Sequence, residues 1–169
     1  ATIMLLQADM GHIQLYDRQR EVLEIVSHQG FEAEFLDYFG TVRGDDGFAC
    51  NRALATGRRV IIEDVQTDPG YAPHRQIAAS AGYRAVQSTP LIGRQGEILG
   101  ILSTHFRQPH HSSDRELRML DLFGRMLSAV ISLALAQRDR QFLLDQARAA
   151  EMANASKDEF LAMLSHELR

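Results

Sequence analysis

The spacing of apolar residues divides the chain near residue 110. Before that point, short apolar runs alternate with polar turns, and eleven of the twelve glycines and all four prolines lie there. After it, only Gly124 interrupts a long segment rich in alanine, leucine, arginine and glutamate. Frequent turn residues are typical of a chain that folds back on itself, whereas their absence favours a long helix. The pattern therefore predicts an α+β domain followed by a long C-terminal helix.

Two pairs of segments in the first part, the first pair alternating between apolar and polar residues, predict β-hairpins. Residues 11–16 and 21–28 flank a polar turn, and residues 84–92 and 96–106 flank the turn GRQG. Because a period of two is the pattern of strands, these hairpins predict one curved antiparallel sheet. Between the hairpins we expect, in chain order, a helix closed by Gly57, a short strand, a turn-rich segment and a helix closed by Gly82, over residues 48–57, 58–65, 66–73 and 74–82.

The long helix is predicted to begin in the segment SSDREL, residues 112–117. Ser113 precedes Glu116 by three residues, which is the spacing of a capping box that satisfies free backbone N–H groups. A helix that continued to Arg169 would be too long for a domain of this size to cover, so we expect it to project from the domain.

A projecting helix needs a partner for its apolar stripe. Five residues at alternating spacings of three and four favour a dimeric coiled coil with a second chain: Leu120, Phe123, Leu127, Val130 and Ala134. This seam weakens over residues 136–141, AQRDRQ. The alternative, that residues 117–135 pack on their own domain, stays open.

Composition and charge narrow the class of protein. The 169 residues, 45% of them hydrophobic, can bury one ordinary core with an appendage left over. The net charge of −4 and the dispersed arginines argue against nucleic acid as a partner. The apolar stretch 126–136 is too short to span a membrane and no signal peptide opens the chain, so we expect a cytoplasmic protein. Cys50 is the single cysteine, which excludes an intramolecular disulfide and a cysteine-based metal cluster.

The last fourteen residues, SKDEFLAMLSHELR, place a histidine on the polar side of a helix. On a helical wheel, His166 lies roughly 160° from the centre of the apolar cluster formed by its neighbours. A solvent-exposed imidazole beside the carboxylate of Glu167 is suited to act as a nucleophile.

Two parts of the chain resemble known families. The runs FACNRALATGRRVIIEDVQTDP and AGYRAVQSTPLIGRQGEILGILSTHF resemble a GAF domain of bacterial signalling proteins, and the resemblance covers residues 1–135. The tail SKDEFLAMLSHELR resembles the H-box of the dimerisation and phosphoacceptor domain of sensor histidine kinases. The second resemblance implies that His166 is autophosphorylated, and that Glu167 orients or deprotonates its imidazole for attack on the γ-phosphoryl group of ATP.

These resemblances imply three segments: a GAF domain in 1–135 with a truncated first helix, a coiled-coil linker in 136–155 and the start of the phosphoacceptor helix in 156–169. The kinase family continues into a threonine-proline pair, a second helix and an ATP-binding domain, which this sequence does not contain. We therefore expect a fragment of a two-component sensor kinase that is inactive alone. The complete protein is expected to use ATP and Mg²⁺, to form a homodimer, and to pass the phosphoryl group to a response regulator.

The GAF resemblance also implies a small-molecule pocket between the sheet and the helices over it. Its polar candidates are Tyr71, His74, Arg84, Gln87, Ser88 and Thr104. The alternative is that Gln87, Ser88 and Thr104 pair internally and apolar side chains fill the space. The domain would then be either a receptor for a small ligand or chromophore, or a structural spacer that relays an upstream signal, and the sequence leaves both open.

No cofactor is expected in this segment. Bilin-binding GAF domains carry a cysteine immediately before a histidine in the later helix, where this chain has Pro73 and His74, so Cys50 is expected to be a buried apolar residue. Haem needs one axial histidine, for which His28, His74 and His105 are candidates, but single histidines are more often hydrogen-bonded structural residues. His110 and His111 are adjacent in a loop and do not easily face one metal ion, so no metal is predicted.

Overall fold

The computed structural model describes residues 7–43 and 47–167, apart from the side chains of Ser165 and Glu167. The expected truncated helix at residues 1–9 falls mostly outside this range. The chain divides into two compact units, Ala1–Val130 and Ile131–Arg169. The first unit contains a six-stranded antiparallel sheet in the order β3-β2-β1-β6-β5-β4.

Both predicted hairpins are confirmed. β1 pairs with β2, β5 pairs with β6, and the β1–β6 pairing joins the two hairpins into one sheet. In the first turn, the Asp17 carboxylate accepts hydrogen bonds from the backbone N–H groups of Gln19 and Arg20, which stabilises the reversal. The strands are β1 (Met10–Asp17), β2 (Val22–Gln29), β3 (Thr41–Arg43), β4 (Val60–Ile62), β5 (Ala85–Ile92) and β6 (Ile98–Phe106).

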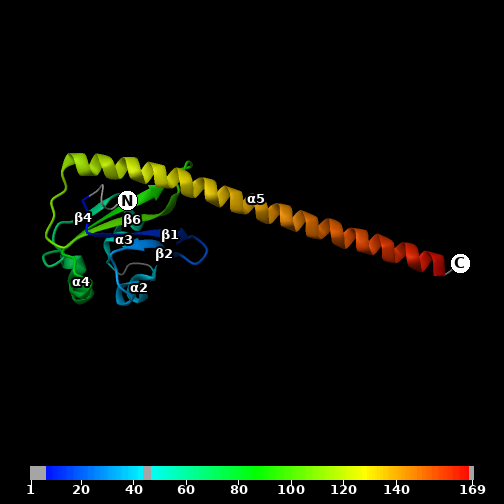
Figure 1. Cartoon of the computed structure of the whole chain (residues 1–169), viewed down its shortest axis with the longest axis horizontal. Coiled ribbons are helices and arrows are strands. Elements are labelled where there is room, and N and C mark those ends of the chain that lie inside the picture. Colours follow the sequence, from blue (N-terminus) through cyan, green and yellow to red (C-terminus); the bar gives the residue numbers. More distant parts are fainter. Residues whose placement is uncertain (1–6, 44–46, 168–169) are drawn as a thin grey trace. The chain divides into compact units, whose positions relative to one another are not determined.

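Short helices cover one face of the sheet (Figure 1). The predicted helices are confirmed as α3 (Ala49–Thr56) and α4 (Arg75–Ala81), and each is followed by a glycine in the left-handed conformation, Gly57 or Gly82. The predicted turn-rich segment contains the 3-10 helix η1 (Pro69–His74). The sequence analysis missed α2 (Ala33–Phe39), which buries Phe35 and Phe39 in the core.

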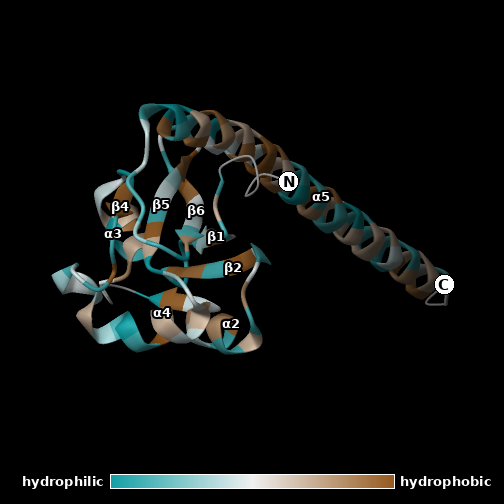
Figure 2. Cartoon of the chain, turned by 60° about the vertical axis from the view of Figure 1, so that its left-hand side comes forward, coloured by the Kyte–Doolittle hydropathy of each residue, from teal (hydrophilic) through white to brown (hydrophobic). Residues whose placement is uncertain are grey.

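The other face of the sheet is covered by the first part of α5 (Asp114–Glu167) (Figure 2). Leu120 is 2% exposed, and a side chain at Gly124 would lie 3.9 Å from Thr89 Cγ2 and 4.0 Å from Leu91 Cδ2 of β5. Arg59 strengthens the contact, because its guanidinium donates a hydrogen bond to Thr89 Oγ1 and forms an ion pair with Asp121 of α5. Of the two alternatives for the start of this helix, the structure therefore shows packing on its own domain.

The predicted capping box at the start of α5 is confirmed. Ser113 N donates to Glu116 Oε2 at 2.7 Å, and Glu116 N donates to Ser113 Oγ at 3.3 Å. The Ser113 carbonyl also accepts a hydrogen bond from Leu117 N at 3.0 Å. Ser113 is therefore the N-cap residue of α5.

Replacing Ser113 with alanine is expected to lower the free energy of unfolding by about 1 kcal/mol, because the backbone N–H of Glu116 loses its acceptor. Urea denaturation followed by circular dichroism measures the effect. Ser113→Asp retains an acceptor at the cap and is expected to keep most of the stability. Equal stability of the alanine variant and the wild type would show that this cap does not contribute.

The sequence analysis expected no segment that could span a membrane, but α5 contains one that meets the criteria of length and composition. One stretch of 18 residues within Asp114–Leu164 is long and apolar enough by length and composition alone. In the first unit, however, Leu120 and Ser128 are buried. Of that 18-residue stretch, 17% is buried, so most of its residues are not covered by the domain in this structure.

Candidate functional site

A small aromatic-lined cavity lies between the sheet and its short helices. The open space is about 10 Å³, which admits no more than a single water molecule. Phe35 and Phe39 of α2 stack with ring centroids 4.4 Å apart and fill much of the interior. The lining residues are His12, Phe35, Phe39, Phe48, Ala49, Cys50, Tyr71, Val86, Ser88, Ser103 and His105.

Two buried histidines, His12 of β1 and His105 of β6, lie diagonally across the β1–β6 pairing. The ring centroids of His12 and His105 lie 5.2 Å apart, and the residues are 5% and 2% exposed. Among the described residues, neither ring nitrogen of His12 has a hydrogen-bond partner, and the same holds for Nδ1 of His105. Burial lowers the pKa of His12 to about 4, against a smaller opposing effect of Gln14, and lowers the pKa of His105 well below its usual value. Both imidazoles are therefore neutral at pH 7.

The hydroxyl groups around the cavity are paired with one another. Ser88 Oγ and Ser103 Oγ lie 2.8 Å apart, and the phenolic oxygens of Tyr71 and Tyr83 lie 3.0 Å apart. Burial raises the pKa of both tyrosines, so they stay protonated. These pairs satisfy their own polar atoms, whereas both ring nitrogens of His12 and Nδ1 of His105 have no hydrogen-bond partner among the described residues.

The predicted pocket residues are not all brought together. Tyr71 and Ser88 line the cavity. His74 packs behind it, with its ring centroid 3.8 Å from that of Phe48 and its Nδ1 3.3 Å from Tyr38 Oη. Arg84 lies outside, because its guanidinium is paired with Asp64, where Nε donates to Oδ1 at 3.0 Å.

Gln87 and Thr104 do not line the cavity, contrary to the prediction. They are cross-strand partners on β5 and β6, directly beside the Ser88–Ser103 pair. Because successive side chains of a strand point to opposite faces, Gln87 and Thr104 lie on the sheet face that α5 covers. Of the three residues that the alternative paired internally, Ser88 is paired with Ser103, whereas Gln87 Oε1 and Thr104 Oγ1 lack hydrogen-bond partners among the described residues.

The remaining histidines and Cys50 do not form a metal centre in the described part of the chain. No group of three or more histidine, cysteine, aspartate or glutamate side chains there is arranged to hold an ion. His28 is exposed, His110 Nε2 lies 3.0 Å from Glu116 Oε1, and His111 Nδ1 lies 2.5 Å from Glu63 Oε1. Cys50 is 5% exposed in the core, as an apolar residue would be.

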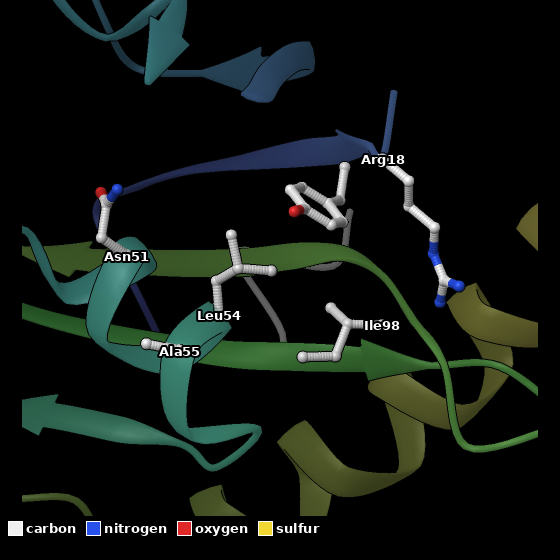
Figure 3. Close-up of a pocket in the computed structure, with 6 residues that line it drawn as sticks. Arg18, Asn51, Leu54, Ala55 and Ile98 are labelled. Carbon is white, nitrogen blue, oxygen red and sulfur yellow. The ribbon is translucent and has the colours of Figure 1, made fainter. Parts of the chain in front are cut away.

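A wider cleft lies between α3 and the ends of β1 and β6 (Figure 3). Its volume of about 550 Å³ lies in the range of small-molecule sites. Leu54, Ala55 and Ile98 form an apolar surface, and Arg18 stands at one end of the cleft. The Asn51 amide at the other end donates to the Arg43 carbonyl at 3.2 Å, so this donor is already used. The sequence analysis did not identify this cleft.

His166 lies in the last turn of α5 and is exposed, as predicted from the helical wheel. The side chain of Glu167, its expected helper, lies outside the described residues. The structure thus provides an accessible imidazole on a helix, while the role of either residue stays a prediction.

Comparisons with known proteins identify the first unit. A family model described as GAF domain matches residues 1–132. The methyl sulfide methyltransferase-associated sensor of Methanosarcina acetivorans is 31% identical over 68 residues, which are 40% of this chain and 7% of that protein. The chain therefore spans a small part of this relative.

Solved structures share the fold. A domain of a two-component sensor histidine kinase protein from Sinorhizobium meliloti 1021 has a TM-score of 0.68 at 19% identity, over 83% of this chain and 92% of that one. The GAF domain of a phosphoenolpyruvate-protein phosphotransferase from Coxiella burnetii has a TM-score of 0.68 at 22% identity, over 79% and 77% of the two chains. At these identities the structures establish the fold alone. Since the family model covers most of the sequence and the sheet with its flanking helices is shared, this chain belongs to the GAF domain family.

Proposed function

We propose that this chain is the sensory and transmission region of a two-component sensor histidine kinase, with His166 as the phosphorylated residue. The observation that carries the proposal is the Ser-His-Glu-Leu-Arg sequence of residues 165–169, in which His166 is exposed in the last turn of α5. The first part of the same helix packs on a GAF domain. The proposed complete protein is a cytoplasmic homodimer with its own ATP-binding domain. It uses ATP and Mg²⁺ and passes the phosphoryl group to a response regulator.

The proposed chemistry needs an accessible neutral imidazole. A ring nitrogen of His166 attacks the γ-phosphorus of ATP, an N–P bond forms, and the P–O bond to ADP breaks. The imidazole N–H proton leaves to a base, for which the neighbouring Glu167 carboxylate is the candidate. An exposed position on a helix suits this step, because the ATP-binding domain must approach the histidine from outside.

The test is phosphorylation of the chain by an added histidine-kinase ATP-binding domain with radiolabelled ATP. We expect an acid-labile, alkali-stable label on the wild type and its complete loss in His166→Gln. His111→Gln removes another exposed histidine and is expected to keep the label. If His166→Gln were labelled as strongly as the wild type, the phosphoacceptor assignment would be wrong.

A second function, that of a small-molecule receptor, is favoured by the unpartnered nitrogens of His12 and His105. A polar ligand that reached them would satisfy buried groups that otherwise cost free energy. The aromatic side chains that fill the cavity favour instead a structural spacer that relays an upstream signal. Native mass spectrometry distinguishes the two, because a receptor retains extra mass that His12→Phe removes, whereas a spacer carries none.

A further inference from the structure

The first part of α5 has two apolar faces with different surroundings. The inner face, with Leu120 and Gly124, packs on the sheet. Leu122 and Met126 lie on another face of the same turns and are 46% and 55% exposed. The pairing surface predicted through Leu120, Phe123 and Leu127 is thus occupied by the domain itself, whereas Leu122 and Met126 stay exposed among the residues that the structure describes.

The exposed face follows a seven-residue repeat. The repeat consists of positions spaced alternately by three and four residues, from Met119 to Leu164. All of these positions are apolar except Arg140, Asn154 and Lys157. We call these positions the outer stripe. Figure 2 shows hydrophobic positions recurring along α5. A strict seven-residue repeat over several turns is the signature of a two-helix coiled coil, whereas lipid would not select this spacing.

The outer stripe of the second unit is also exposed. Leu133 and Leu143 are 61% and 64% exposed, and Leu161 and Leu164 are exposed as well. Small residues, such as Ala136, stand between them. Small side chains allow two helices to approach closely, so the stripe is apolar without being bulky.

The amount of apolar surface suits a stable dimer. Burying one leucine or methionine side chain removes roughly 100 Å² from water, and an alanine about half of that. Summed over the outer stripe, the surface is on the order of 800 Å² per chain, which is what a standard specific interface takes from each partner. A second copy of the chain supplies a matching stripe without any further partner.

We propose that the outer stripe of α5 is the pairing surface for a second copy of this chain, with the two helices parallel and in register. The proposal deepens the proposed function, because it specifies the face used by the homodimer. Asn154 at a core position supports the parallel arrangement, since in register it faces its own copy and pairs with it. His166 comes two residues after Leu164, roughly 170° from the stripe, so the dimer leaves both histidines accessible.

Three substitutions at neighbouring positions in the full chain test which face of α5 pairs with the second copy. Leu133→Glu places a charge in the outer stripe, Ala134→Glu places it in the seam predicted from sequence, and Leu135→Glu places it in neither. All three residues are exposed in the second unit, so the fold of each variant is expected to be unchanged, which circular dichroism checks. Sedimentation equilibrium reports the mass.

We expect a wild-type dimer, a dimer for Ala134→Glu and Leu135→Glu, and at least about a hundredfold weaker association for Leu133→Glu. A monomeric wild type would overturn the proposal. Dissociation by Ala134→Glu but not by Leu133→Glu would also overturn it in favour of the other seam. Binding of the wild type to phosphatidylcholine vesicles that Leu133→Glu abolishes would assign the stripe to a membrane instead.

The parallel register has its own test. In a Cys50→Ala background, Leu133→Cys is expected to form an interchain disulfide, because equivalent core positions face each other in a parallel dimer. Arg138→Cys lies on the outside and is expected not to cross-link. Cross-linking of Arg138→Cys alone would overturn the register. Loss of the dimer with His166 still phosphorylated would refute only the pairing surface, whereas an unlabelled dimer would refute only the phosphoacceptor.

Discussion

Replacing Gly100 with alanine is expected to destabilise the domain by about 3 kcal/mol or more. Gly100 lies in β6 opposite Leu15 of β1. A Cβ at this position would lie 2.0 Å from the backbone oxygen of Gln14 and 3.1 Å from the Leu15 Cα. Both atoms belong to the neighbouring strand, so they cannot move aside without breaking the pairing that joins the two hairpins. Urea denaturation followed by circular dichroism measures the loss.

Gly124→Ala is the matched control, because the same change is made where there is room. Its Cβ would meet Thr89 Cγ2 at 3.9 Å, an ordinary van der Waals contact. Since alanine is favoured over glycine inside a helix, this variant is expected to be more stable than the wild type by about 0.5–1 kcal/mol. Wild-type stability of Gly100→Ala would mean that the β1–β6 register differs from the one described.

The hairpins could be predicted from sequence because their signals are local. For the first hairpin, alternation with a period of two and a polar turn lie within one stretch of about twenty residues. For the second, the turn GRQG separates two runs rich in apolar residues. The missed helix α2 is only seven residues long, and its signal is the spacing of four between Phe31, Phe35 and Phe39. The missed strand β3 has three residues, which is too short to show a period.

The candidate site was harder to predict because it depends on which way each strand faces. β5 and β6 are buried on both faces, so apolar and polar positions do not alternate visibly along them. The sequence therefore could not separate Ser88 from Gln87. His12 was missed for a related reason, since its meeting with His105 depends on the pairing of strands far apart in the chain.

Which face of α5 stays exposed could not be predicted from the sequence either. α5 carries apolar residues on two faces in its first part, and either spacing fits a seam between helices. Only the packing of Leu120 and Gly124 on the sheet shows which face remains exposed.

Lowering the pH from 7 to 5 is expected to reduce the free energy of unfolding by about 2 kcal/mol through His12, and further through His105. Burial lowers the pKa of both histidines in the folded state, to about 4 for His12, whereas each has a pKa near 6.5 when unfolded. As the pH falls below 6.5, the unfolded state binds protons that the folded state does not. Stability then decreases by about 1.4 kcal/mol per pH unit and per histidine, until the folded-state pKa is reached.

Urea denaturation at pH 7, 6 and 5 measures this dependence, and single substitutions assign it. His105→Phe is expected to remove the part of the decrease that His105 causes, whereas His166→Phe, whose side chain is exposed in the last turn of α5, is expected to leave the decrease unchanged. Nδ1 of the buried His105 has no hydrogen-bond partner among the described residues, which costs free energy that phenylalanine avoids, so His105→Phe is also expected to be at least as stable as the wild type at pH 7. A flat pH profile would show instead that the two rings are hydrated or paired in the folded protein.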